Sequence, residues 1–356
     1  MLRNFDGDRR SWRLRILAIV AVLCCAGAPP CGADELAFRA QIKNHTADLF
    51  MNERFDELDR MAEYLRSTGN RSESGLWTLT FFYSGISDLA GGKTDDERYW
   101  SEIEAKAKRW TTQSPRSPAA QISYSILLEK HAWSIRGFGW SREVRPEDWQ
   151  PFREYIERAR LNLLNCKDTA DVDPRWYETM LDIARAQKWK VEEFEKLVDE
   201  ASARHPYFYP IYFSAAEYVL PKWYGSGEKI EALAGAAVGK TRPEDGAGMY
   251  ARIYWYASQA EYHGRLFTES PIDWNRMRQG IEDVLKQYPD GWNINNFAHF
   301  ACRAWDRSMT RDLIGRIEGE PIADAWESPA QYQRCKAWAL RDPTAGRTVQ
   351  HRNPQR

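Results

Sequence analysis

The chain has 356 residues, with 50 Lys and Arg against 51 Asp and Glu, so its formal net charge is −1. This near-neutral balance lacks the excess of positive charge that generic nucleic-acid binding requires, and we expect no nucleic-acid partner. The 16 Trp, 17 Tyr and 14 Phe can form a large core, because each buried ring removes roughly 150–250 Å² from water.

The first 33 residues have the three parts of a secretory signal peptide. Five arginines surround the start of an apolar run at 16–28, and Cys31-Gly32-Ala33 offers small residues to a peptidase. We therefore expect cleavage after Ala33 and an exported protein, either periplasmic or extracellular. The apolar run is shorter than the ~20 residues that span a bilayer, so no integral membrane segment is expected in the mature chain. The alternative is a buried N-terminal helix, which the flanking arginines oppose.

The rest of the chain is predicted to be one helical-repeat domain at 34–340 and a disordered tail at 341–356, where Pro, Gly and Arg show no apolar period. Apolar residues three and four positions apart between Phe55 and Leu65 predict the first helix. Further helices are expected at about 75–89, 96–111, 117–136, 149–166, 175–188, 191–204, 209–220, 228–239, 247–263, 272–287, 292–305 and 308–317. No segment sustains the alternation of a strand, which predicts an all-α fold.

A repeated spacing suggests how these helices are arranged. Pro174 and Pro206 lie 32 residues apart, as do Pro289 and Pro321, and each interval contains two short helical patterns. A helix pair closed by proline, with about 34 residues per unit, is typical of tetratricopeptide-type solenoids. We therefore predict an α-solenoid of tetratricopeptide-like helical hairpins, with a ligand groove lined by the first helix of each pair.

Three cysteines lie outside the signal segment: Cys166, Cys302 and Cys335. We favour three buried free thiols that act as small hydrophobic groups. The alternative is one disulfide, which an oxidising compartment permits, and Cys302–Cys335 is then the best pair.

Sequence patterns for catalysis and for metal binding are weak. Gly235–Thr241 resembles a phosphate-binding loop but has three residues between its glycines instead of four, and we expect a helix that stops at Gly239. His299 and Cys302 share one helix face with Asn295 and Asp306, which we interpret as a partly buried polar stripe. No nucleophile motif is present, so no catalytic residue, metal or cofactor is predicted.

The best binding candidates are aromatic residues and an arginine near turns, since Trp, Tyr and Arg dominate binding interfaces. Asparagines from a neighbouring helix could add hydrogen bonds. The predicted site consists of Trp223, Tyr224, Arg252, Trp255, Asn293 and Asn296. The alternative places the stripe of Tyr250, Tyr254, Ser258 and Tyr262 in the core, with Arg252 paired to an acidic neighbour.

Four segments resemble a known family: WSIRGFG at 133–139, LPKWYGS at 220–226, YARIYW at 250–255 and WNINNFA at 292–298. As a set they are similar to exported bacterial proteins grouped as domain of unknown function 4034, over about residues 40–320. The resemblance implies a helical-repeat fold and export, and it implies no activity or catalytic residues.

Two functional hypotheses follow. The first is a non-catalytic interaction or binding scaffold with a protein or peptide partner, because no catalytic constellation is visible. The alternative is an exported hydrolase that acts on envelope glycan or peptide. A pair of carboxylates with raised pKa values in a deep pocket would favour the hydrolase.

Overall fold

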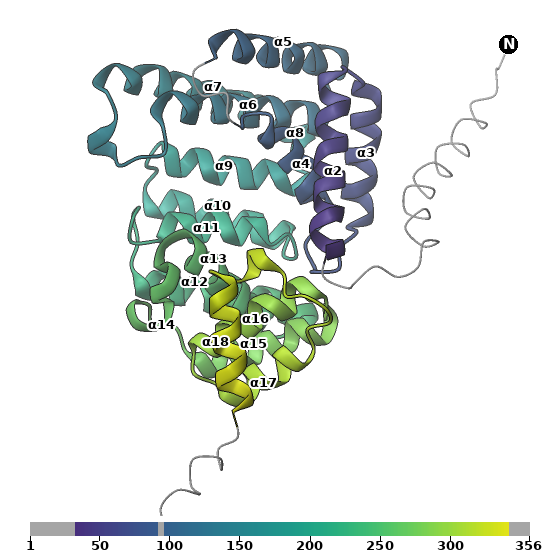
Figure 1. Cartoon of the computed structure of the whole chain (residues 1–356). Helices are drawn as coiled ribbons and strands as arrows, with labels where there is room; N and C mark the ends of the chain where they lie inside the picture. Colours follow the sequence, from purple (N-terminus) through teal and green to yellow (C-terminus); the bar gives the residue numbers. More distant parts are fainter. Residues whose placement is uncertain (1–32, 92–95, 342–356) are drawn as a thin grey trace, which may run out of the picture.

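The computed structural model of the protein describes residues 33–91 and 96–341, and within these ranges the fold is all-α (Figure 1). The one β-type contact in the described ranges is an isolated bridge between Arg71 and Trp77. The all-α prediction is therefore confirmed. The predicted signal segment up to residue 32 and the predicted tail beyond residue 341 lie outside the described residues.

The longer helices follow one another through short connections. They are α2 (Ala33–Met51), α3 (Phe55–Thr68), α4 (Thr78–Asp88), α5 (Glu97–Gln113), α6 (Pro118–Arg136), α7 (Trp149–Asn165), α9 (Pro174–Ala186), α10 (Val191–Arg204), α11 (Pro210–Val219), α12 (Gly227–Asp245), α13 (Gly248–Ala257), α15 (Trp274–Gln287), α16 (Gly291–Arg303), α17 (Arg307–Gly315) and α18 (Pro329–Leu340). A π-helical turn at Ser258–Tyr262 continues α13, and α8 (Lys167–Ala170) and α14 (Leu266–Glu269) are short.

Local sequence accounts for several helix starts. Ser117, Asp173 and Ser328 each accept a hydrogen bond from a backbone N–H of the following turn, and each precedes a proline at the first helical position. Such a side chain satisfies one of the free N–H groups at a helix start, and proline has no N–H to satisfy. These starts are therefore determined by neighbouring residues alone.

The helices stack as pairs. The first helices of successive pairs contact one another, α4 with α6, α6 with α9, α9 with α11 and α11 with α13, while α7, α10 and α12 pack beside them. Figure 1 shows α6, α9 and α11 one below another, and α2 and α3 run beside the stack, next to one end of its upper helices. Two hydrophobic clusters fill the interior, and both include residues of α11.

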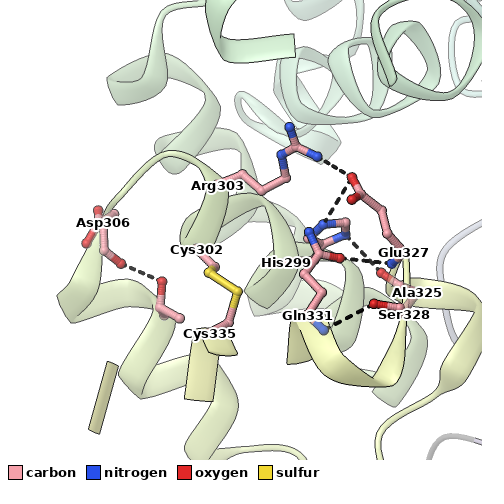
Figure 2. The surroundings of a disulfide bond; sticks show 10 residues. His299, Cys302, Arg303, Asp306, Ala325, Glu327, Ser328, Gln331 and Cys335 are labelled. Carbon is pink, nitrogen blue, oxygen red and sulfur yellow. Dashed lines mark hydrogen bonds and ion pairs between the residues drawn. A yellow bond between two sulfur atoms is a disulfide. The ribbon is translucent and has the colours of Figure 1, made fainter. Parts of the chain in front are cut away.

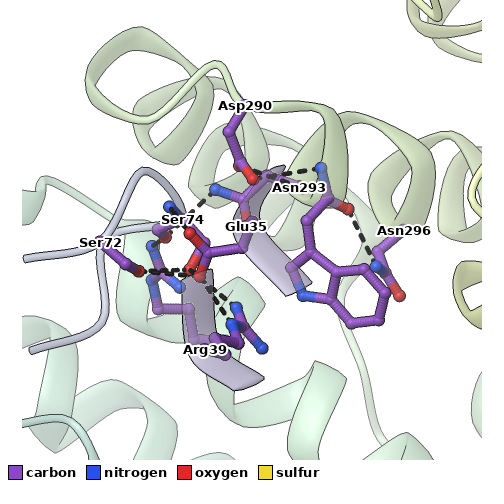
Figure 3. A network of polar contacts seen from close by, with 9 residues as sticks. Glu35, Arg39, Ser72, Ser74, Asp290, Asn293 and Asn296 are labelled. Atoms are coloured by element: carbon purple, nitrogen blue, oxygen red, sulfur yellow. Dashed lines mark hydrogen bonds and ion pairs between the residues drawn. The ribbon is translucent and has the colours of Figure 1, made fainter. Parts of the chain in front are cut away.

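The two ends of the described chain also meet, because α2 contacts α16. Glu35 and Arg39 of α2 lie beside Asp290 and Asn293 at the start of α16 (Figure 3). The row of helices therefore curves, so that α16 near its end contacts α2 at its start.

The cysteine prediction was wrong for two of the three thiols. Cys302 and Cys335 form a disulfide that ties α16 to α18 (Figure 2), whereas Cys166 is free and half-buried. The bonded pair is the one that the sequence analysis named as its alternative, although the α18 helix falls outside the predicted set.

The expected helix end at Gly239 was also wrong. The α12 helix continues through Gly239 and Pro243 to Asp245, and the chain turns at Gly246, whose φ is 56°. Val238, Thr241 and Asp245 are buried beyond the predicted end, so packing on one face extends the helix. Among the described helices, none is long and apolar enough to cross a membrane.

Candidate functional site

Three adjoining cavities follow α6, α9, α11, α13 and α16, and we call them the cleft, the arginine cavity and the histidine cavity. Their volumes are about 590, 150 and 370 Å³. Glu217 lines the cleft and accepts a hydrogen bond from Tyr256, which lines the arginine cavity. The arginine and histidine cavities share Trp255 and Gln259. A larger hollow of about 1130 Å³ beside α7 shares Trp149 and Lys188 with the cleft.

The cleft is built around stacked arginines and tryptophans. The Arg185 guanidinium lies 4.6 Å from the centre of the Trp223 ring and 5.6 Å from that of Trp133. Arg136 covers the Trp133 ring at 5.1 Å. The Tyr224 hydroxyl donates to the carbonyl oxygen of Arg185 at 3.2 Å. Cation–π contacts of this kind fix the rings and guanidinium groups in one arrangement before any ligand arrives.

The cleft has a surplus of positive charge. Its lining contains five cationic residues, Lys130, Arg136, Arg185, Lys188 and Lys222, against two acidic ones, Glu129 and Glu217. The Glu217 carboxylate is already occupied by Trp223 Nε1 at 3.0 Å, Lys222 Nζ at 2.9 Å and the Tyr256 hydroxyl at 2.8 Å. Burial lowers the pKa of the Arg136 guanidinium, which means that its charge is incompletely solvated.

Groups suited to a ligand lie along the cleft. The buried indole N–H of Trp133 has no hydrogen-bond partner among the described residues. At the rim, Phe138 and Trp140 are 81% and 61% exposed. An unpaired buried donor costs free energy until it finds an acceptor, and exposed aromatic rings favour an apolar partner.

The arginine cavity lies where the ends of the chain meet. Arg252 donates from Nη2 to the carbonyl oxygen of Ser74 at 2.8 Å, and Asn293 Nδ2 donates to the same oxygen at 3.2 Å. Glu35 accepts from the Ser72 and Ser74 hydroxyls and from Arg39 (Figure 3). Arg39 also donates to Ser74 Oγ at 2.8 Å. This network holds the α3–α4 loop against α13 and α16.

The histidine cavity contains a neutral histidine of defined tautomer. His299 Nδ1 lies 3.1 Å from the Ala325 carbonyl oxygen and must donate to it, because a carbonyl only accepts (Figure 2). In the neutral form Nε2 carries a lone pair; it has no hydrogen-bond partner among the described residues, and Glu327 Oε1 lies 3.9 Å from it. Burial lowers the His299 pKa and so favours this neutral form.

The predicted polar stripe has structural roles, and Asp306 does not share a helix face with the others, because α16 ends at Arg303. Asn295 accepts from Trp326 Nε1 at 3.1 Å, and Asp306 caps α17 by accepting from Met309 N. Cys302 is held in the disulfide, so its sulfur is no candidate metal ligand in this state.

Buried acids lie behind the cleft. Burial raises the pKa of Glu178 to about 7 despite its ion pair with Arg175. The Asp182 pKa is also raised, first by burial and then by the charge of Glu129. Asp182 lies 3.7 Å from Arg185, which lines the cleft.

All six sequence-predicted site residues line these cavities. Trp223 and Tyr224 lie in the cleft, Arg252 and Asn293 in the arginine cavity, Asn296 in the histidine cavity, and Trp255 between the last two. The alternative in the sequence analysis placed the tyrosine stripe in the core, and this is correct for the tyrosines at positions 250, 254 and 262. It was wrong for the Arg252 side chain, which bonds to a backbone carbonyl and not to a carboxylate.

Sequence reasoning did not assign Trp133, Arg136, Arg185 and Trp292 to the site. Trp133 and Arg136 belong to the WSIRGFG segment, so that segment could have pointed to them. Arg185 had no comparable signal, because its role depends on packing between the rings of Trp133 and Trp223.

Comparison with known proteins supports the resemblance over the first part of the chain. The family model described as Domain of unknown function (DUF4034) matches residues 42–191. The WSIRGFG segment lies within this match, and the other three segments lie after it. No curated protein and no solved structure matches the chain. Residues 42–191 of this protein are therefore similar to the family of unknown function DUF4034.

Proposed function

We propose that the protein is a binding scaffold that holds an extended peptide or protein segment along the three cavities. One observation carries this proposal: the cleft presents a preformed stack of Arg136, Trp133, Arg185 and Trp223 beside an unpaired indole N–H. Rigid aromatic and arginine side chains in a concave surface are the usual anchors of a binding interface. The stacked helix pairs support a solenoid that presents its first helices to the ligand.

The partner segment should be acidic and should contain aromatic or apolar side chains. Lys130, Arg185 and Lys222 of the cleft form ion pairs with Glu129, Asp182 and Glu217. Arg136 and Lys188 form no ion pair with a described residue, and these two cations favour negative charge in a partner. The exposed rings of Phe138 and Trp140 at the rim favour an apolar side chain.

We propose that this binding takes place outside the cytoplasm. The signal-peptide pattern at the start of the sequence is one support. The disulfide between Cys302 and Cys335 is a second and independent support, because disulfides persist mainly in oxidising compartments.

Selection from a random peptide display library tests the proposal. We expect selected peptides to be enriched in Asp, Glu and aromatic residues, and Trp223→Ala to weaken their binding at least ~10-fold, or about 1.4 kcal/mol. Trp305→Ala is the matched control, because Trp305 is 76% exposed and contacts Trp338 away from the cavities. No enrichment, or equal losses in the two variants, would contradict the proposal.

A hydrolase is the second candidate function, favoured by the raised pKa values of Glu178 and Asp182 beside the cleft. A carboxyl group protonated near pH 7 can act as a general acid. The test is release of products from envelope glycan and peptide substrates by wild type and by Glu178→Gln. Turnover that Glu178→Gln abolishes while the fold is kept would support this candidate, and absence of turnover would remove it.

A further inference from the structure

Arg252 is a buried cation whose hydrogen-bonding capacity is mostly unused. Its side chain is 6% exposed and lies between the rings of Tyr209 and Tyr288, at 5.0 and 5.8 Å. Of its five N–H donors, only Nη2 makes a hydrogen bond to a described residue, the one to Ser74 O. Burial of a charge without hydrogen-bond partners costs free energy, so an acceptor for the unused donors would stabilise the side chain.

The surrounding protein does not supply that acceptor. Glu35 is engaged with Arg39, Ser72 and Ser74. Asp245 Oδ1 accepts from the Tyr209 hydroxyl at 2.7 Å, and Asp245 Oδ2 is buried and has no hydrogen-bond partner among the described residues. No carboxylate among the described residues forms an ion pair with Arg252, although Asp245 is near enough to favour its charge. Burial correspondingly lowers the Arg252 pKa.

The cavity beside Arg252 has the size and lining for a small anionic group. Its volume of about 150 Å³ is several times the ≈ 30 Å³ that one water occupies in the liquid. Arg39 lines the same cavity, with its guanidinium 5.5 Å from the Trp292 ring. Arg39 Nε and Nη2 already donate to Glu35 and Ser74, so its Nη1 is the group left for a ligand. Guanidinium groups bind carboxylates through planar pairs of N–H donors, and two guanidinium groups line this cavity together with the Trp255 and Trp292 rings.

A second unsatisfied atom restricts the ligand further. Asn293 is fully buried and lines the cavity, and its Oδ1 has no hydrogen-bond partner among the described residues. An amide oxygen needs a donor, which a simple anion lacks. A peptide carboxylate satisfies both requirements, because an amide N–H lies close to it along the chain.

We infer that the arginine cavity is a carboxylate subsite, in which Arg252 and Arg39 bind a carboxylate of the partner peptide while Asn293 Oδ1 accepts the neighbouring amide N–H. This rests on the proposed function, since the peptide would continue into the cleft. The carboxylate can come from the peptide C-terminus or from an Asp or Glu side chain.

Small probes separate these sources without knowledge of the natural partner. The Arg252 Nε–H signal is followed by NMR, and the spectrum of Arg252→Lys identifies it. N-acetylglycine carries a terminal carboxylate beside an amide N–H, the α-monoamide of N-acetylaspartic acid carries only the side-chain carboxylate, and N-acetylglycinamide is the neutral control. We expect a saturable shift with at least one of the carboxylates, and at least ~10-fold weaker binding of the neutral amide.

Arg252→Lys keeps the positive charge and can still reach Ser74 O, so it separates ligand binding from folding. We expect this variant to bind the preferred carboxylate about tenfold more weakly, because Lys lacks the planar fork. Equal binding of N-acetylglycinamide, stronger binding of inorganic phosphate, or no shift up to ~50 mM carboxylate would overturn the inference. If Trp223→Ala still weakened the binding of library peptides, the proposed function would stand without this subsite.

Discussion

Arg252 Nη2 donates a 2.8 Å hydrogen bond to the carbonyl oxygen of Ser74, 178 residues earlier in the chain. Asn293 Nδ2 donates to the same oxygen, so both lone pairs of one carbonyl join the α3–α4 loop to α13 and α16. The contact holds the start of the helix stack against its end, and it also forms one wall of the arginine cavity. A substitution of Arg252 is therefore expected to change both the stability of the fold and ligand binding in the arginine cavity.

Arg252→Ala should lower the free energy of unfolding by about 1–3 kcal/mol, because it removes a buried hydrogen bond and the packing between Tyr209 and Tyr288. Arg276→Ala is the matched control, since Arg276 also lies over a tyrosine ring, at 4.3 Å, but its side chain is 45% exposed. Urea denaturation should show a loss of at most ~1 kcal/mol for the control. Equal losses would mean that the Ser74 contact adds nothing to stability.

Gly75→Ala should destabilise the fold more than Gly137→Ala, although both glycines have positive φ, 93° and 73°. A Cβ at Gly75 would lie 2.7 Å from Tyr288 Cδ2 and 2.8 Å from Arg252 Nη2, whereas a Cβ at Gly137 meets nothing within 4 Å. The Gly137 variant reports backbone strain alone, about 1–3 kcal/mol at φ 73° and ψ 173°, and the Gly75 variant adds a clash of about 1–3 kcal/mol. Thermal unfolding of the two proteins measures the difference, and similar melting temperatures would disprove the close approach.

Asp290 should make stability fall as pH rises from about 4 to 6. It caps α16, and burial, with a smaller contribution from Glu35, raises its pKa from 3.8 to about 6. Between these values the folded state binds more protons than the unfolded state, so unfolding becomes easier with rising pH and the effect levels off above pH 6. A shift of this size corresponds to at most roughly 3 kcal/mol.

Asp290→Asn tests this directly, because asparagine is an equally good N-cap and does not titrate. The stability of the variant relative to wild type should increase by about 2–3 kcal/mol between pH 4 and pH 7. Asp273→Asn at the exposed cap of α15 reports the cost of the same substitution in solvent. A pH-independent difference between Asp290→Asn and wild type would refute the raised pKa.

Cys302→Ser should destabilise the C-terminal part of the chain by about 2–4 kcal/mol, because the disulfide closes a separation of 33 residues and holds α18 on α16. Hydrogen exchange should show faster opening at 329–340 in the variant, and a reducing agent should produce the same effect in wild type. Cys166→Ser serves as the control, since Cys166 is not bonded. Unchanged exchange in α18 would show that packing alone holds this helix.

Export should remove the first 33 residues, so protein recovered from the source cell should begin at Asp34. N-terminal sequencing of the envelope or extracellular fraction measures this. An intact Met1 terminus in cytosolic protein would contradict both the export proposal and its support from the disulfide.

Much of the secondary structure could be predicted because it depends on near neighbours. The apolar spacing from Phe55 to Leu65 and the Asp173-Pro174 start of α9 are each set within one or two helical turns, and both helices form where expected. The spaced prolines marked two real helix pairs, α9 with α10 and α16 with α17. Residue type and position near turns suggested the six candidate site residues, which line the cavities; their role in binding stays a prediction.

The remaining features depend on contacts between distant segments. Gly239 ends a helix by local rules, but burial of Val238, Thr241 and Asp245 carries α12 past it. The Cys302–Cys335 bond requires α18 to pack on α16, and the burial of Arg252 requires Ser74 to arrive from the other end of the chain. Local propensity is encoded in a few adjacent residues, whereas pairing, burial and cavity formation depend on which surfaces meet when the whole chain packs.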